Sequence, residues 1–109
     1  MSNENDFLEA AKQHYEALMA GNEAGWRETL SSIAKSGSRP EQWWKLGRAM
    51  VENQGVRYEL KGVDEARSKD GHKRIFFRRL KADGGEVGRP VPADVVQEGG
   101  RWLVVSASY

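Results

Sequence analysis

Apolar residues in the first half of the chain recur every three or four positions, which is the spacing of amphipathic helices. This pattern predicts helices over residues 6–20, 23–34 and 40–52. The first helix has a clear start signal, because Asp6 is followed three residues later by Glu9 in a capping-box arrangement. We therefore expect an N-terminal layer of three helices.

The second and third predicted helices carry large apolar residues. Asn22 is expected to cap the second helix, whose apolar face consists of Trp26, Leu30 and Ile33. The third helix contains Gly47 in the middle of a broad apolar face. A glycine at such a place predicts that another element packs closely against the backbone there.

After residue 55 the pattern changes to alternation of apolar and polar residues, which is typical of strands with one buried face. The predicted strands are residues 56–63, 73–82, 89–97 and 101–109. Pro90 and Pro92 cannot donate to a ladder, so the third strand should start at a sheet edge or a bulge. Glycine-rich turns between the strands favour an antiparallel meander. Helices followed by strands predict a single α+β domain over residues 1–109.

Two of the predicted strands have apolar residues on both faces. In residues 73–82, Ile75 and Phe77 share one face, and Phe76 lies on the other among arginines. The last strand places Trp102 and Val104 on one side, and the other side holds Leu103, Val105, Ala107 and Tyr109. Helices cover only one face of a sheet, so the second face predicts a homodimer. The expected interface residues are Phe76, Arg78, Leu103 and Val105.

Four tryptophans among 109 residues are a heavy aromatic load. A core filled with large side chains accounts for it. The alternative is an aromatic-lined cavity that binds a small apolar or planar ligand. The residues that would line such a cavity are Tyr15, Trp26, Trp43, Tyr58 and Phe77.

Charge and composition narrow the function classes. The net charge is +1, from 17 basic and 16 acidic residues, whereas dedicated nucleic-acid binders are usually more basic. The arginines around Phe76 in residues 73–81 keep a single-stranded nucleic-acid platform open as an alternative. The absence of cysteine excludes thiol catalysis and thiolate metal sites. His14 and His72 do not form a metal-ligand pair with a nearby carboxylate, so we expect no metal and no cofactor.

The start of the chain has no apolar export signal, and no segment is long and apolar enough to span a bilayer. These features favour a cytoplasmic protein. His14 borders the apolar stripe of the first helix and is expected to be a half-buried packing residue.

Two segments, "HYEALMAGNEAGW" and "VVQEGGRWLVVSAS", resemble the first helix–turn–helix and the last hairpin of the NTF2-like (cystatin-like cone) superfamily. The order of the elements agrees over nearly the whole chain, and small bacterial members are the most similar. The resemblance implies a sheet that curls around the helices, with a cavity between them. It also implies pairing of the outer sheet face with a second copy.

The superfamily includes isomerases and dehydratases as well as non-catalytic domains, so the resemblance alone leaves the function open. It implies that Tyr15 could stabilise an oxyanion with Asp94 beside it. His14, next to Tyr15 in the sequence, is an alternative proton-transfer group. The isomerase general base, however, has no counterpart in residues 31–42. We therefore favour a non-catalytic domain that binds a small apolar ligand or a protein partner as a homodimer. A small isomerase or dehydratase is the alternative.

Overall fold

The computed structural model describes residues 6–109, and the expectation about an export signal falls on the start of the chain, outside the described residues. Within them the helices are α1 (Asp6–Ala20), α2 (Glu23–Glu28), α3 (Ser32–Lys35) and α4 (Arg39–Gln54). The strands are β1 (Arg57–Val63), β2 (His72–Leu80), β3 (Val91–Glu98) and β4 (Arg101–Ala107). A short 3₁₀ helix, η1 (Glu65–Arg67), joins β1 to β2.

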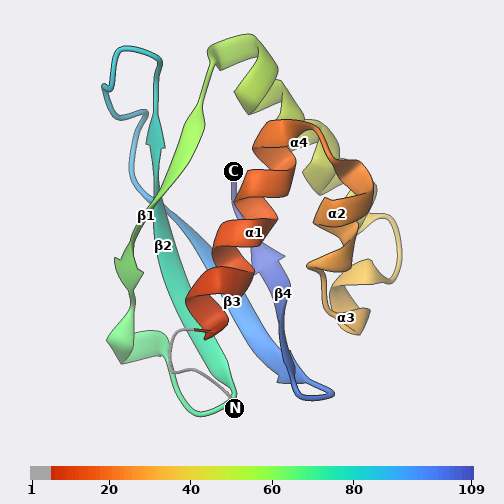
Figure 1. Ribbon diagram of the computed structural model, residues 1–109. Helices are drawn as coiled ribbons and strands as arrows, with labels where there is room; N and C mark the ends of the chain where they lie inside the picture. Colours follow the sequence, from red (N-terminus) through yellow and green to blue (C-terminus); the bar gives the residue numbers. More distant parts are fainter. Residues whose placement is uncertain (1–5) are drawn as a thin grey trace.

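The strands form one antiparallel sheet in the order β1-β2-β3-β4, and the helices pack on one of its faces (Figure 1). The predicted α+β class and the four-stranded meander are confirmed. No helix in the described part of the chain combines the length and apolar character needed to cross a membrane.

Local signals in the helices act as the sequence predicts. The Asn22 side chain accepts a hydrogen bond of 3.0 Å from the Gly25 N–H, so it caps α2. Gly55 ends α4 in the left-handed conformation, with φ of 65°. Gly47 faces Leu18, and a Cβ atom at Gly47 would lie 2.8 Å from both Leu18 methyl carbons. The predicted close approach at Gly47 is confirmed.

The prediction of one helix over residues 23–34 is wrong. The chain leaves the helix after α2 and pairs with β4, with Val104 N–H donating to the Thr29 carbonyl at 2.7 Å and Ser31 N–H donating to the Val104 carbonyl at 2.8 Å. This pairing covers the outer edge of β4, which would otherwise present unpaired main-chain groups. Ile33 consequently leaves the predicted apolar stripe and is 69% exposed.

The predicted faces of β4 need a correction after Val104. Asp94 pairs with Ser106 but Val95 pairs with Val104, so Val105 is an extra residue in β4, a β-bulge. After the bulge, each side chain of β4 points to the face opposite to the one that simple alternation predicts. Ala107 and Tyr109, expected on the outer face with Leu103, therefore belong to the core on the helix side.

The third strand, β3, is an inner strand between β2 and β4, but its start extends past the first β3–β4 pair, Ala93 with Ala107, and the register shifts soon after, between Asp94 and Val95. This agrees with the prediction that the strand starts at an edge or a bulge. Pro92 lies opposite Phe76, at the point where the β3–β4 ladder ends. The Pro92 carbonyl still accepts a bond of 3.0 Å from the Ser108 N–H. A proline is tolerated here because its missing N–H falls at the end of a ladder and not in its middle.

Candidate functional site

A cavity of about 330 Å³ opens at the surface between α1 and β1. One face of α1, the chain of β1 and one ring from β2 form its walls. The lining residues are Lys12, Tyr15, Glu16, Met19, Tyr58, Glu59, Leu60 and Phe77. We refer to this site as the α1–β1 cavity.

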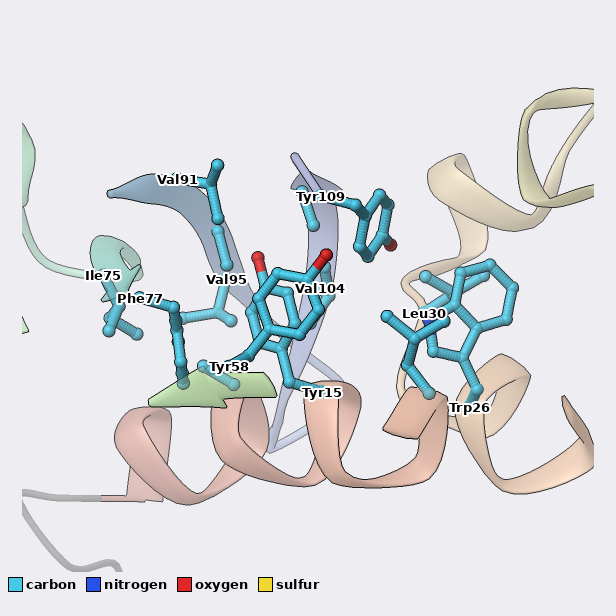
Figure 2. Packing of buried hydrophobic residues seen from close by; sticks show 14 of the residues in the cluster. Tyr15, Trp26, Leu30, Tyr58, Ile75, Phe77, Val91, Val95, Val104 and Tyr109 are labelled. Carbon is cyan, nitrogen blue, oxygen red and sulfur yellow. The ribbon is translucent and has the colours of Figure 1, made fainter. Parts of the chain in front are cut away.

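Three aromatic rings form the inner wall of the α1–β1 cavity. The Tyr15 ring stacks on Tyr58 with centroids 4.8 Å apart, and it lies 4.3 Å from the Phe77 ring. Figure 2 shows these residues converging from α1, β1 and β2 in the packed interior. Because Tyr15 and Phe77 are almost completely buried, the cavity reaches only the outer side of these rings.

The five residues predicted to line a ligand site therefore separate. Tyr15, Tyr58 and Phe77 meet at the α1–β1 cavity, whereas Trp26 is completely buried beside Trp44 at a centroid distance of 5.3 Å. Trp43 is half-buried on α4 and packs against the core. Between the sheet and the helices the rings fill the interior of the fold (Figure 2).

His14 is completely buried, not half-buried as expected, and each ring nitrogen has a partner. Its Nε2 accepts from Trp26 Nε1–H at 3.1 Å and contacts the Tyr109 hydroxyl at 2.7 Å. Because an indole N–H only donates, Nε2 carries no proton in the neutral ring. Nδ1 then donates to the Thr29 hydroxyl at 2.7 Å. Burial lowers the His14 pKa from 6.5 to about 3, so this ring stays neutral near pH 7.

Two buried polar atoms have no hydrogen-bond partner among residues 6–109: the Tyr58 hydroxyl and Nε of Arg79. The two residues face each other across the β1–β2 ladder. Burial raises the pKa of Tyr58 to about 12, although the Arg79 charge acts in the opposite direction. Another guanidinium nitrogen of Arg79 donates to the Tyr109 carbonyl at 3.3 Å.

The comparisons with known proteins address the fold. No protein-family model matches the sequence, and no curated protein is significantly similar to it. Solved structures match over nearly the whole chain. A fivefold-substituted variant of a protein named Rd1NTF2_05 has a TM-score of 0.68 at 18% identity, covering 98% of this chain and 99% of that one.

A second match is a SnoaL-like family protein from Agrobacterium tumefaciens, assigned as an isomerase, with a TM-score of 0.65 at 17% identity. It covers 93% of this chain and 95% of that one. A third, from Methylobium petroleophilum, is a protein of unknown function with a cystatin-like fold, with a TM-score of 0.61 at 12% identity over 98% and 80% of the two chains. This chain has the NTF2-like fold. At these identities the likeness concerns the fold and carries no activity.

Within the NTF2-like fold, the residues of the isomerase alternative do not form a site. The Tyr15 hydroxyl donates to the Ser108 carbonyl at 2.9 Å, and burial raises its pKa well above 10. Asp94 lies on the sheet face away from the helices, where Arg74 binds both carboxylate oxygens at 2.9 and 3.2 Å. His72 Nε2 lies 3.6 Å from the same carboxylate. Tyr15 and Asp94 are thus separated by the sheet.

The predicted interface residues lie on this outer face. Phe76 and Val105 are half-buried, and Leu103 is buried outside the main core cluster. Arg78 forms ion pairs with Glu59 at 3.9 Å and with Glu86 at 3.5 Å. The basic run around Phe76 is therefore interleaved with carboxylates.

Sequence reasoning missed the α1 and β1 residues that complete the α1–β1 cavity. Met19 belongs to the predicted apolar stripe of α1, and Lys12 and Glu16 flank this stripe at helical spacing from Met19. The signal was present, but only the structure shows that this flank faces β1. Among residues 6–109, no group of three His, Asp or Glu side chains converges to hold a metal ion.

Proposed function

We propose that this chain is a non-catalytic binding domain, with the α1–β1 cavity as its binding site for a small apolar, planar ligand or side chain. The observation that carries the proposal is the wall of three rings, Tyr15, Tyr58 and Phe77, at a surface opening of about 330 Å³. Planar apolar groups gain from contact with aromatic side chains, both by burial and by ring geometry.

The state of the polar groups argues for binding and against proton transfer. A general base must reach a substrate with an available lone pair. The two nitrogens of His14 are already used inside the core, and the Tyr15 hydroxyl is used by the Ser108 carbonyl. Glu16 and Glu59, the carboxylates at the cavity rim, are exposed to water and lie outside the packed core.

Indole is a suitable probe, because it is planar, apolar and small. In two-dimensional amide NMR, we expect indole to shift the signals of Leu60 and Phe77 in a saturable manner. Glu16→Trp should fill the opening and abolish these shifts. Gln13→Trp places the same side chain elsewhere on α1, where it faces β4 and not β1, and should leave them unchanged. Absent shifts, or shifts that persist in Glu16→Trp, would reject the site.

We further propose that the outer sheet face forms a homodimer through Phe76, Leu103 and Val105. Phe76 and Leu103 alternate with core residues along β2 and β4, so they belong to the sheet face on which no helix packs (Figure 1). Phe76 and Val105 are half-buried in the monomer and Leu103 is 8% exposed, and partly exposed apolar residues on an uncovered sheet face are a usual basis for symmetric pairing. Native mass spectrometry should give a doubled mass for the wild type and a monomer for Val105→Asp. Gln97→Asp, an exposed position on β3, is the matched control and should remain dimeric. A monomeric wild type would refute the dimer.

A further inference from the structure

The edge of β1 next to the α1–β1 cavity has main-chain groups that point away from the sheet. Tyr58 N–H does not bind β2; it points to Met19 Sδ at 3.3 Å. Thioether sulfur is a weak acceptor, so this donor is only weakly satisfied. On the other side, the carbonyl of Arg79, the partner of Tyr58 across the ladder, accepts from Val87 N–H at 2.8 Å and so also points away from β1.

The directions of the Tyr58 N–H and the Arg79 carbonyl determine which facing residue pairs of the β1–β2 ladder are hydrogen-bonded. In an antiparallel pair, residues that face each other alternate between hydrogen-bonded and non-hydrogen-bonded pairs. Tyr58 and Arg79 form a non-hydrogen-bonded pair, so Glu59 and Arg78 form a bonded pair, and Leu60 and Phe77 again a non-bonded pair. Both the N–H and the C=O of Leu60 therefore point off the sheet edge. The register shifts directly after Leu60, because Leu60 pairs with Phe77 but Gly62 pairs with Phe76, so Lys61 is an extra residue and the regular outward edge ends at Leu60.

The cavity and this edge are one continuous surface. Tyr58, Glu59 and Leu60 line the α1–β1 cavity and also form the outward edge of β1. A chain laid along β1 would direct every second side chain to the helix side of the sheet. The side chain that lies beside Leu60 on the helix side would enter the cavity, against Tyr15 and Phe77.

We propose that the β1 edge and the α1–β1 cavity together bind an extended peptide segment of a partner protein by strand addition. The peptide pairs with the main chain of Leu60 and inserts an aromatic or long apolar side chain into the cavity. Main-chain bonds supply affinity in this mode, and the pocket for the alternate side chain supplies specificity. This inference rests on the proposed function, since it assigns a class of partner to the same cavity.

The charges at the rim specify the neighbours of the inserted side chain. Glu16 and Glu59 contribute two carboxylates, and among residues 6–109 Glu16 has no ion pair. The one cation of the lining, Lys12, is held by Glu9 at 3.5 Å. A lysine or arginine next to the inserted side chain fits this rim.

A second copy of this chain fits the site less well. If two β1 edges paired, the side chains that each β1 directs to the helix side are Tyr58 and Leu60. Tyr58 is only 6% exposed and is committed to its own core, as is much of Leu60. A second β1 would therefore bring no side chain that could fill the cavity.

The experiment selects phage-displayed random dodecapeptides on the immobilised wild-type protein, with soluble Glu16→Trp protein as competitor. Selected sequences are synthesised, and their affinity is measured by fluorescence anisotropy. We expect Glu16→Trp to weaken binding by at least about tenfold and Gln13→Trp to leave it unchanged. Methylation of the peptide amide that donates to the Leu60 carbonyl should weaken binding by about tenfold, and methylation of the amides on either side should not, because those amides point away from β1.

Each outcome of this experiment either supports or overturns strand addition at the β1 edge. Enriched peptides that show both effects support strand addition at this site. Cavity-dependent peptides in which methylation of no single amide weakens binding refute strand addition, and the cavity stands as a ligand site. If no peptide is enriched, the peptide proposal is overturned; the indole titration then shows whether the cavity proposal fails with it. A dimer that dissociates in Glu16→Trp would assign the edge to a second copy and overturn the proposal.

Discussion

Acid should destabilise this protein through His14 in particular. The ring is completely buried, and burial lowers its pKa to about 3 in the folded state, against 6.5 when exposed to water. The unfolded chain therefore binds a proton below pH 6.5 that the folded chain does not bind. The stabilisation by the neutral ring is complete above pH 6.5 and is lost progressively as the pH falls toward 3.

The size of this effect follows from the interval between the two pKa values. Each pH unit corresponds to about 1.4 kcal/mol, so the loss amounts to about 2 kcal/mol at pH 5 and about 5 kcal/mol below pH 3. Urea unfolding followed by tryptophan fluorescence measures it, because Trp26 hydrogen-bonds to the ring. The relevant quantity is a difference between variants, because the pH dependence that two variants share cancels in it.

His14→Gln supplies this difference. The glutamine amide can still accept from Trp26 and Tyr109 but has no proton to gain in this range. Between about pH 7 and about pH 5, the wild type should lose about 2 kcal/mol more free energy of unfolding than His14→Gln. An identical pH dependence in the wild type and His14→Gln would refute the buried neutral ring.

Two further predictions follow from the packing of the core. Gly47→Ala should lower the free energy of unfolding by about 1 kcal/mol in urea titration, because crowding against Leu18 outweighs the higher helix propensity of alanine; a stabilised variant would contradict this. All three tyrosines, Tyr15, Tyr58 and Tyr109, have pKa values raised chiefly by burial, so the native protein should show no tyrosinate absorbance up to about pH 11. Tyrosinate absorbance near pH 10 without unfolding would show that at least one of these rings is accessible.

The alternation of β2 shows what could be predicted from the sequence. Ile75 and Phe77 face the core and Phe76 faces away from it, as the period of two requires. The same rule failed in β4, because a single bulged residue, Val105, reverses every later side chain. No residue at this position signals a bulge, which exists only in the pairing with β3.

The break after α2 was hidden for a similar reason. Trp26 and Leu30 have helical spacing, and both are buried, but Leu30 is buried by its position beside Val104 of β4. A local pattern cannot distinguish these two ways of burying the same residue. Tertiary pairing with the β4 edge prevailed over local helix propensity.

The candidate site was predictable in its chemistry but not in its position. The sequence indicates that rings such as Tyr15, Tyr58 and Phe77 come together, and they do so at the α1–β1 cavity. It does not indicate that they pack against one another, with Tyr109 and His14 occupying the adjacent interior. Whether rings fill a cone or line it depends on distances of a few ångströms, which residue spacing does not encode.

The filled interior bears directly on where a ligand can bind. A ligand placed between the sheet and the helices would have to displace Tyr15 or Phe77. This displacement would disrupt a close-packed core and lower the stability of the fold. At the α1–β1 cavity, Met19 lines the wall and holds its Sδ 3.3 Å from the Tyr58 N–H. Under the proposal, an occupant that moves this flexible side chain would also release the Tyr58 N–H toward the sheet edge, and occupation of the cavity would be coupled to exposure of the β1 edge. This coupling favours an occupant that uses both features, such as an extended peptide, over one that uses the cavity alone.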